Sequence, residues 1–401
     1  MKNGDLFSGI AIVIDDEIGT KNANINNLIS QIEKRKMPYK KYLALPSLDI
    51  IDHFDGISFL LLDWQLPPKT LSNSIVEGVK IPSAIAESAI EENIAFLMKI
   101  REVCFTPVFI FTNEDVKNVK EILIHAGLYK DNKPNHIFIK SKKDLIGRKK
   151  LFNTINEWIK KTPSIYVLKA WEKEYKKSKN KLFHDFYAMS PNWPRVLWKT
   201  FSDDGTNMSL ELGEVISRNL CSRMMPFTFD DKILGKFRKK APKAEIRKVL
   251  SGECFIDKNG LHEDVITAGD TFMISDLTYI NIRPDCDCIL NRVTAGNMND
   301  DIDLYLLRGS KLRNNEERKK FRDKYGNFEE IDNESIVFNM INGKTFKFAF
   351  KELTIMKWSE IKDKRIGRLL PPYITRMQQR YALYLQRQGL PRIPNAAVKG
   401  T

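Results

Sequence analysis

The sequence predicts an α/β protein that begins with a doubly wound parallel sheet and ends in a β-rich module, with a helical segment between them. Two observations lead to this prediction. Residues 1–160 alternate short apolar runs with amphipathic helical patterns, as strand–helix–strand units do. From residue 251 on, short β-like runs such as TFMIS and TFKFAF follow one another closely. We therefore expect three parts: residues 1–161, 162–250 and 251–401.

The strands of the first part are predicted from runs that are apolar with little interruption, as in parallel strands that are buried on both faces. In chain order they are IAIVI (10–14), YLAL (42–45), SFLLLD (58–63), PVFIFT (107–112) and HIFIK (136–140). Amphipathic helical patterns lie at 22–36, at 116–123 and at 144–161. Because crossovers between parallel strands are right-handed, this alternation predicts a doubly wound sheet.

The rest of the chain is predicted in less detail. A long, lysine-rich helical pattern follows Pro163 and predicts a packed linker helix, and residues 190–250 look helical and irregular. The β-rich part is expected to form a small barrel or sandwich, with a hairpin turn at the NG dipeptide 342–343. A last helix is predicted to start at Pro371 and Pro372.

Composition narrows the class of protein. The hydrophobic content of 42% is that of a globular chain. No apolar run approaches the roughly 20 residues that span a bilayer, so we expect no membrane insertion. The amino terminus lacks the pattern of a signal peptide, and the five cysteines do not suggest a disulfide framework, so a cytoplasmic location is expected.

Carboxylates follow two of the predicted strands. Asp15 and Asp16 come directly after the first strand, and Asp63 ends the third. In doubly wound sheets, ligands bind at the carboxyl ends of the strands. If the first and third strands are neighbours, the three carboxylates converge, and their mutual repulsion calls for a cation. Oxygen ligands with open positions suit Mg²⁺.

A hydroxyl and an ammonium group complete the predicted site. Thr112 ends the fourth strand and Lys140 ends the fifth. A metal ion, a hydroxyl and an ammonium around one carboxylate would stabilise the charge on a phosphoryl group that is transferred to that carboxylate. The pattern therefore predicts an acceptor of a phosphoryl group at Asp63.

The ordered motifs IDDE, LLLDWQLPP, FIFTNED and IFIK resemble those of the receiver domain of bacterial two-component response regulators, over about residues 9–145. The resemblance implies a flavodoxin-like fold and phosphorylation of Asp63, with bound Mg²⁺, by a sensor histidine kinase or a related ATPase. It implies metal ligation by Asp15, Asp16, Asp63 and the backbone carbonyl of Gln65, and contacts of Thr112 and Lys140 with the phosphoryl group. The stretch between Asp63 and Thr112 is longer than in the family. This leaves two interpretations open: a receiver that senses through its enlarged third helix region, and one that takes up phosphate as a sink or decoy.

The last part of the chain leaves an alternative function open. The net charge of +14 is uneven, and residues 351–401 hold eleven basic against three acidic residues. In the last predicted helix, Arg376, Arg380 and Arg387 fall on one side, next to tyrosines. Such an edge could bind a partner protein, the acidic segment 251–300 or nucleic acid. The alternative is therefore a non-catalytic binding or scaffold protein with a divergent pseudo-receiver and a basic C-terminal surface that binds nucleic acid. The fusion of a divergent receiver to an unfamiliar module leaves open a third possibility, a place in a bacterial defence or stress system.

Two cysteines raise the question of a second metal site. Cys286 and Cys288 stand two apart in the segment NIRPDCDCIL. As zinc ligands they would need partners such as Cys254 and His262, because one C-x-C pair lacks the paired spacing of zinc ribbons. Alternation along a strand would point both thiols to one face, so we expect buried structural cysteines.

Overall fold

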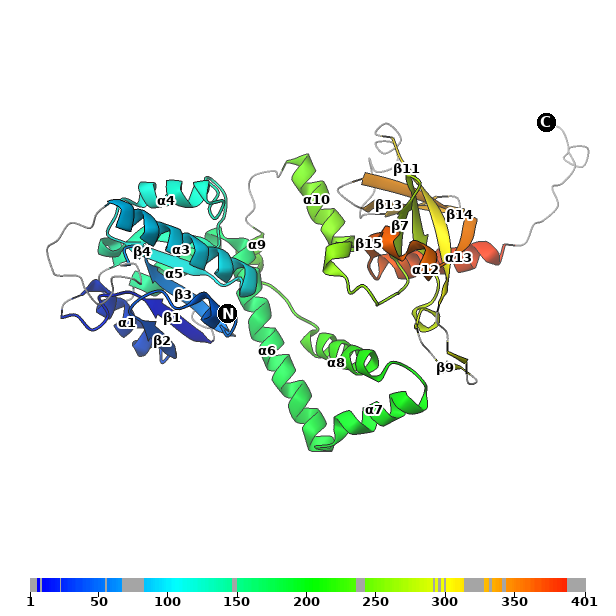
Figure 1. Cartoon of the computed structure of the whole chain (residues 1–401), viewed down its shortest axis with the longest axis horizontal. Helices are drawn as coiled ribbons and strands as arrows, with labels where there is room; N and C mark the ends of the chain where they lie inside the picture. Colours follow the sequence, from blue (N-terminus) through cyan, green and yellow to red (C-terminus); the bar gives the residue numbers. More distant parts are fainter. Residues whose placement is uncertain are drawn as a thin grey trace, which may run out of the picture. The chain divides into compact units, whose positions relative to one another are not determined.

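The structure is a computed structural model of the whole chain and consists of two compact units. The first unit comprises Met1–Ala188 and Arg218–Phe237, and the second comprises Met189–Ser217 and Arg238–Thr401 (Figure 1). The structure describes residues 6–387, with the exception of residues 8, 22, 55, 67–82, 146–149, 236–241, 291–292, 295–296, 299–300, 314–327, 332–333 and 341–343. The predicted division at residues 161 and 250 stays a prediction.

The first unit is built on a five-stranded parallel sheet with the strand order β2-β1-β3-β4-β5. This is the flavodoxin-like order, so the predicted doubly wound fold is confirmed for this part of the chain. Its elements are β1 (Ile10–Ile14), α1 (Asn24–Lys34), β2 (Tyr39–Tyr42), α2 (Leu48–Ile51), β3 (Ile57–Asp63), α3 (Ser83–Val103), β4 (Val108–Thr112), α4 (Val116–His125), β5 (Ile137–Ser141), the 3₁₀ turn η2 (Lys142–Leu145), α5 (Lys150–Lys161) and α6 (Pro163–Met189).

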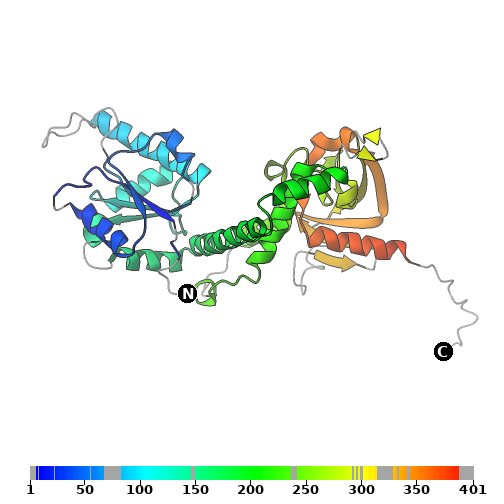
Figure 2. The same cartoon turned by 90° about the horizontal axis from the view of Figure 1, so that it is seen from below.

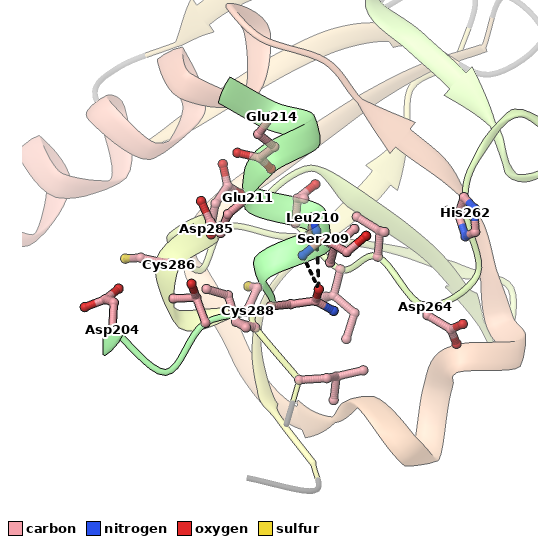
Figure 3. A pocket seen from close by; sticks show the side chains of 17 residues that line it. Asp204, Ser209, Leu210, Glu211, Glu214, His262, Asp264, Asp285, Cys286 and Cys288 are labelled. Atoms are coloured by element: carbon pink, nitrogen blue, oxygen red, sulfur yellow. Dashed lines mark hydrogen bonds between the residues drawn. The ribbon is translucent and has the colours of Figure 1, made fainter. Parts of the chain in front are cut away.

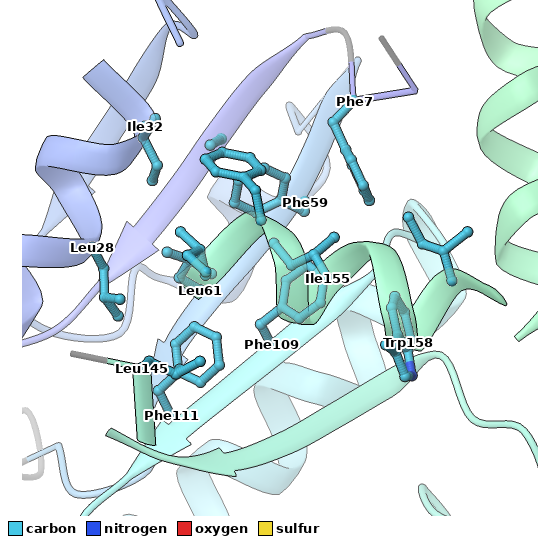
Figure 4. Packing of buried hydrophobic residues seen from close by; sticks show 14 of the residues in the cluster. Phe7, Leu28, Ile32, Phe59, Leu61, Phe109, Phe111, Leu145, Ile155 and Trp158 are labelled. Carbon is cyan, nitrogen blue, oxygen red and sulfur yellow. The ribbon is translucent and has the colours of Figure 1, made fainter. Parts of the chain in front are cut away.

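Apolar cores lie on both faces of this sheet, which explains why the central strands are apolar with little interruption. One core joins α1 and α5 to the sheet, with Phe59 and Phe109 packed edge to face at 5.6 Å (Figure 4). The other core lies under α3 and α4 and includes Phe96 and Leu123. The two cores fix β1 and β3 side by side, and this pairing brings their carboxyl ends together.

The second strand differs from its prediction. The apolar run YLAL (42–45) was expected to form it, but β2 is the preceding polar segment Tyr39–Tyr42. The physical reason is its place at the edge of the sheet, where Lys40 and Lys41 project to solvent and continuous burial is not needed.

The second unit contains an eight-stranded antiparallel sheet with the order β12-β13-β14-β11-β8-β7-β15-β6. The prediction of a β-rich module is confirmed at this level. Its elements are α7 (Trp193–Asp203), α10 (Lys243–Cys254), β6 (Phe255–Asp257), η3 (Lys258–Gly260), β7 (Asp270–Ile274), β8 (Leu277–Asn281), η4 (Asp285–Asp287), β9 (Val293–Thr294), β10 (Asn297–Met298), β11 (Asp303–Lys311), β12 (Phe328–Ile331), β13 (Ser335–Met340), β14 (Lys344–Lys357), α12 (Trp358–Ile361), η5 (Lys362–Lys364), β15 (Arg365–Leu369) and α13 (Tyr373–Leu385). Helix α8 (Met208–Met224) contributes to both units, because the boundary falls after Ser217, and α9 (Asp231–Leu234) belongs to the first unit.

Strands β13 and β14 form the antiparallel pair that the NG dipeptide predicted, with Met340 opposite Lys344. The dipeptide itself lies outside the described residues. The two runs TFKFAF and LTIMKW, expected as separate strands, are one long strand, β14.

Helix α13 packs along one face of this sheet (Figure 2). Ile374 and Met377 are buried in the core, and Tyr381 and Tyr384 contact Phe350 at ring distances of 6.1 and 5.8 Å. Stacking of bases on these two tyrosines was one of the options left open by the sequence, and in the structure they pack against the core. Among the described residues, no helix combines the length and the apolar character that a membrane span requires.

Candidate functional site

Three carboxylates meet at the carboxyl edge of the parallel sheet, where β1 and β3 end. One ligand oxygen from each of Asp15, Asp16 and Asp63 lies within 4.8 Å of the other two, close enough for one ion to contact all three. Asp15 and Asp63 are buried, whereas Asp16 is exposed. The predicted convergence therefore occurs because β1 and β3 are neighbours. The oxygen-only donor set fits a hard divalent cation such as Mg²⁺.

The ammonium group at this cluster belongs to Lys142, not to Lys140 as predicted. Lys142 Nζ lies 2.6 Å from Asp63 Oδ2 and 2.9 Å from Asp15 Oδ2, and its side chain is 1% exposed. Lys140 lies inside β5, opposite Phe111 of β4, and is half-buried. A side chain inside a strand points to one face of the sheet. Lys142 instead follows the last residue of β5, so its side chain can reach the carboxylates at the carboxyl ends of β1 and β3.

The sequence signal for Lys142 was ambiguous. The segment KSKK offers lysines at 140, 142 and 143, and Lys140 and Lys142 share the same parity in a strand. The alternation of side chains therefore could not separate them. What separates them is the end of β5 at Ser141, which the sequence prediction placed one residue earlier.

The charges of the site are strongly coupled. Burial, and next the nearby charge of Asp63, raise the pKa of Asp15 to about 6. The same two causes raise the pKa of Asp16. Burial opposes the charge on Lys142, but attraction to Asp63 and hydrogen bonds to Asp63 and Asp15 outweigh it and raise the pKa of the ammonium group. The site is thus short of positive charge, as expected of carboxylates arranged for a cation.

Backbone groups fix the carboxylates of Asp63 and Asp15. The N–H of Gln65 donates to Asp63 Oδ1 at 3.2 Å, and the N–H of Glu17 donates to Asp15 Oδ1 at 3.0 Å. Thr112 is fully buried at the end of β4, one residue beyond the Phe111 that pairs with Asp63. The Oγ1 of Thr112 accepts the N–H of Glu114 at 3.0 Å, which fixes its hydroxyl at the same edge.

The three arginines predicted on the last helix do not form one open row, and Arg387 lies beyond the end of α13 at Leu385. Arg376 and Arg387 are exposed, Arg380 is half-buried, and Arg387 pairs with Glu334 at 2.7 Å. A role in binding nucleic acid or a partner protein stays a prediction.

The two neighbouring cysteines line a pocket in the second unit, but they do not share a face. The segment forms the 3₁₀ turn η4 rather than a strand, so Cys286 is exposed while Cys288 is buried (Figure 3). The pocket, of about 600 Å³, is also lined by Asp204, Glu211, Glu214, His262, Asp264 and Asp285. Cys254 belongs to the core on the α13 face, and Cys288 belongs to another core. Within the described residues, the one group spaced to hold a metal ion is Asp15, Asp16 and Asp63.

The comparisons with known proteins find likeness to receiver domains. The BeF₃-activated DrrB receiver domain shares 13% identity, covers 38% of this chain and 97% of its own, and gives a TM-score of 0.23. A response regulator receiver domain from Rhodospirillum rubrum shares 15% identity, covers 37% of this chain and 89% of its own, and gives a TM-score of 0.23. No family model and no curated protein matches the chain. A TM-score of 0.23 carries no argument, so the function proposed below rests on the strand order and site geometry of this chain.

Proposed function

We propose that this protein accepts a phosphoryl group on Asp63 in the presence of Mg²⁺ and signals the change to the rest of the chain. One observation carries the proposal: three carboxylates that converge within 4.8 Å, with Lys142 bridging two of them, at the carboxyl edge of a parallel sheet. Asp15 and Asp63 are both buried and share one ammonium group, so a divalent cation would supply the positive charge that Lys142 alone does not.

Each residue has a defined part in this proposal. An oxygen of Asp63 attacks the phosphorus of a phosphohistidine, the P–N bond breaks as the P–O bond forms, and the leaving imidazole nitrogen takes up a proton. Asp15, Asp16 and Asp63, with the carbonyl of Gln65, would hold Mg²⁺, which supplies positive charge for the phosphoryl oxygens. Lys142 and the hydroxyl of Thr112 would contact the transferred group. The donor would be a sensor histidine kinase or a related ATPase.

Phosphorylation with a small phosphodonor tests this function without the kinase. Incubation of the full-length protein with acetyl phosphate and Mg²⁺ should add the mass of one phosphoryl group, measured by intact mass spectrometry. Asp63→Asn should abolish the addition, as should removal of Mg²⁺ with EDTA. The matched control is Asp131→Asn, because Asp131 is an exposed aspartate of the same unit, outside the site. A phosphoryl group found on the Asp63→Asn protein would refute the assignment.

A further inference from the structure

An amide side chain lies on the apolar face of α3. Asn93 is 1% exposed and precedes Phe96, Leu97 and Ile100, which are all buried, by three, four and seven residues. This spacing places the four side chains on one face of the helix. An amide in such a row must be taken out of water, so its presence calls for a hydrogen bond that an apolar residue could not make.

Asn93 forms this hydrogen bond with the backbone just after Asp63, the proposed acceptor. Nδ2 of Asn93 donates to the backbone oxygen of Trp64 at 2.9 Å. This oxygen and the N–H of Gln65 belong to the same peptide unit, and that N–H donates to Asp63 Oδ1. One end of the peptide unit is therefore held by α3 and the other end holds the acceptor carboxylate.

The amide keeps this bond at a cost. Its Oδ1 is buried and has no hydrogen-bond partner among the described residues, and the same is true of Nε1 of the buried Trp64. A buried polar atom without a partner costs about 1–3 kcal/mol. A leucine would fill a similar volume and avoid that cost, so packing alone does not account for Asn93.

We propose that Asn93 is a positioning residue of the acceptor site. It fixes the peptide unit between Trp64 and Gln65, and thereby the orientation of the Asp63 carboxylate and of the next carbonyl, that of Gln65, toward the divalent cation. The inference rests on the proposed function, and it also gives the enlarged third helix a direct connection to the site.

Metal binding separates positioning from simple structural support. In Asn93→Leu and Asn93→Ala, the Kd for Mg²⁺, followed by tryptophan fluorescence, should rise by about 10-fold or more, as for partners that orient metal ligands. The control Leu97→Ala removes a buried side chain of the same helix face that makes no hydrogen bond to the loop. It should lower the urea midpoint with a change of less than about 2-fold in Kd. An unchanged Kd in both Asn93 variants would overturn the inference, as would an equal rise in the control.

A second measurement needs no metal, so it distinguishes failure of the inference from failure of the proposed function. With ¹⁵N-glutamine labelling, amide exchange at Gln65 should be faster in metal-free Asn93→Leu than in wild type, and unchanged in Leu97→Ala. If wild type binds no Mg²⁺ but substitution of Asn93 speeds amide exchange at Gln65, Asn93 does fix the peptide unit and the proposed function fails. If wild type binds Mg²⁺ and neither exchange nor Kd responds to Asn93, the function stands and the inference fails.

Discussion

Lys142 is placed where few lysines occur in folded proteins. Its side chain is 1% exposed, and its ammonium group contacts two carboxylates that are themselves buried. Without that positive charge, Asp15 and Asp63 would repel each other in a poorly solvated site. In the metal-free protein, Lys142 therefore provides part of the charge compensation that a divalent cation would provide when bound.

This view leads to a prediction that compares two lysines. Lys142→Met should destabilise the metal-free protein by about 3 kcal/mol, because it leaves buried carboxylates without their partner. Mg²⁺ should recover more stability in this variant than in wild type, since the cation then supplies the missing charge. Lys140→Met should change the stability by less than about 0.5 kcal/mol, as expected of a half-buried side chain outside the cluster. Urea unfolding with and without Mg²⁺ measures all three proteins.

Equal losses of stability in Lys142→Met and Lys140→Met would contradict this assignment. So would a Lys142→Met protein whose stability does not respond to Mg²⁺, because the cluster would then not be a cation site.

At the residue scale, the sequence predicted the carboxylates better than their partners. Asp15 and Asp63 follow buried apolar strands, and that local pattern fixes where their carboxylates lie once the strands pair. Lys142 depends on where a strand ends, to within one residue, and such boundaries are set by tertiary packing. Asn93 could have been noticed as a polar residue within an apolar helical stripe, but its partner, the Trp64 carbonyl, is a backbone atom that leaves no trace in the sequence.

At the scale of elements, burial decides which strands a sequence reveals. β1, β3 and β4 are covered on both faces, so their sequences are apolar with little interruption, and they were predicted to within one residue. The edge strand β2 has the sequence YKKY, in which both lysines are exposed. It therefore contains no apolar run from which a strand could be predicted. The same reasoning explains why two runs that form the single long strand β14 looked like two strands, since its middle is exposed around Lys351.

Helix α6 is attached to the first unit by a buried lysine. Lys169 is 2% exposed, and its ammonium group donates to the backbone oxygen of Ile57, at the start of β3, at 3.1 Å, and to Glu172 at 2.8 Å. Burial lowers the pKa of Lys169, and Glu172 opposes that shift. β3 thus ends in Asp63, the proposed acceptor, and its first residue, Ile57, binds Lys169 of α6.

The anchor is tested by removal of the charge alone. Lys169→Met should lower the free energy of unfolding by about 1–3 kcal/mol, because the Ile57 carbonyl loses its charged donor. Lys177→Met is the matched control on the same helix, since Lys177 is 74% exposed in its pair with Glu174, and such pairs contribute little. Amide exchange should report loosening of α6 near Lys169 in the first variant. A Lys169→Met protein as stable as the control would show that α6 is held by apolar packing alone.

At the scale of the whole molecule, the first unit draws on segments well beyond the parallel sheet. Ile165 and Tyr166 of α6 are buried in the same core as α1 and α5. Phe227 and Phe229, about sixty residues further along the chain, pack against that core, and the N–H of Asp230 donates to the hydroxyl of Tyr166 at 2.7 Å. This return could not be predicted from the sequence, because aromatic residues in an irregular segment form no periodic pattern.

A series of fragments tests where the first unit ends. Fragment 1–161 lacks Ile165 and Tyr166, and loss of two large buried side chains removes about 4 kcal/mol of apolar burial from a domain that is stable by about 5–15 kcal/mol. We expect thermal midpoints to rise from 1–161 to 1–188 and again to 1–237, which regains the segment around Phe229. Phe229→Ala in fragment 1–237 should return the midpoint close to that of 1–188. If fragment 1–161 melts at the same temperature as 1–237, the unit ends at the boundary that the sequence predicts, and α6 with the returning segment packs on a domain that is already complete.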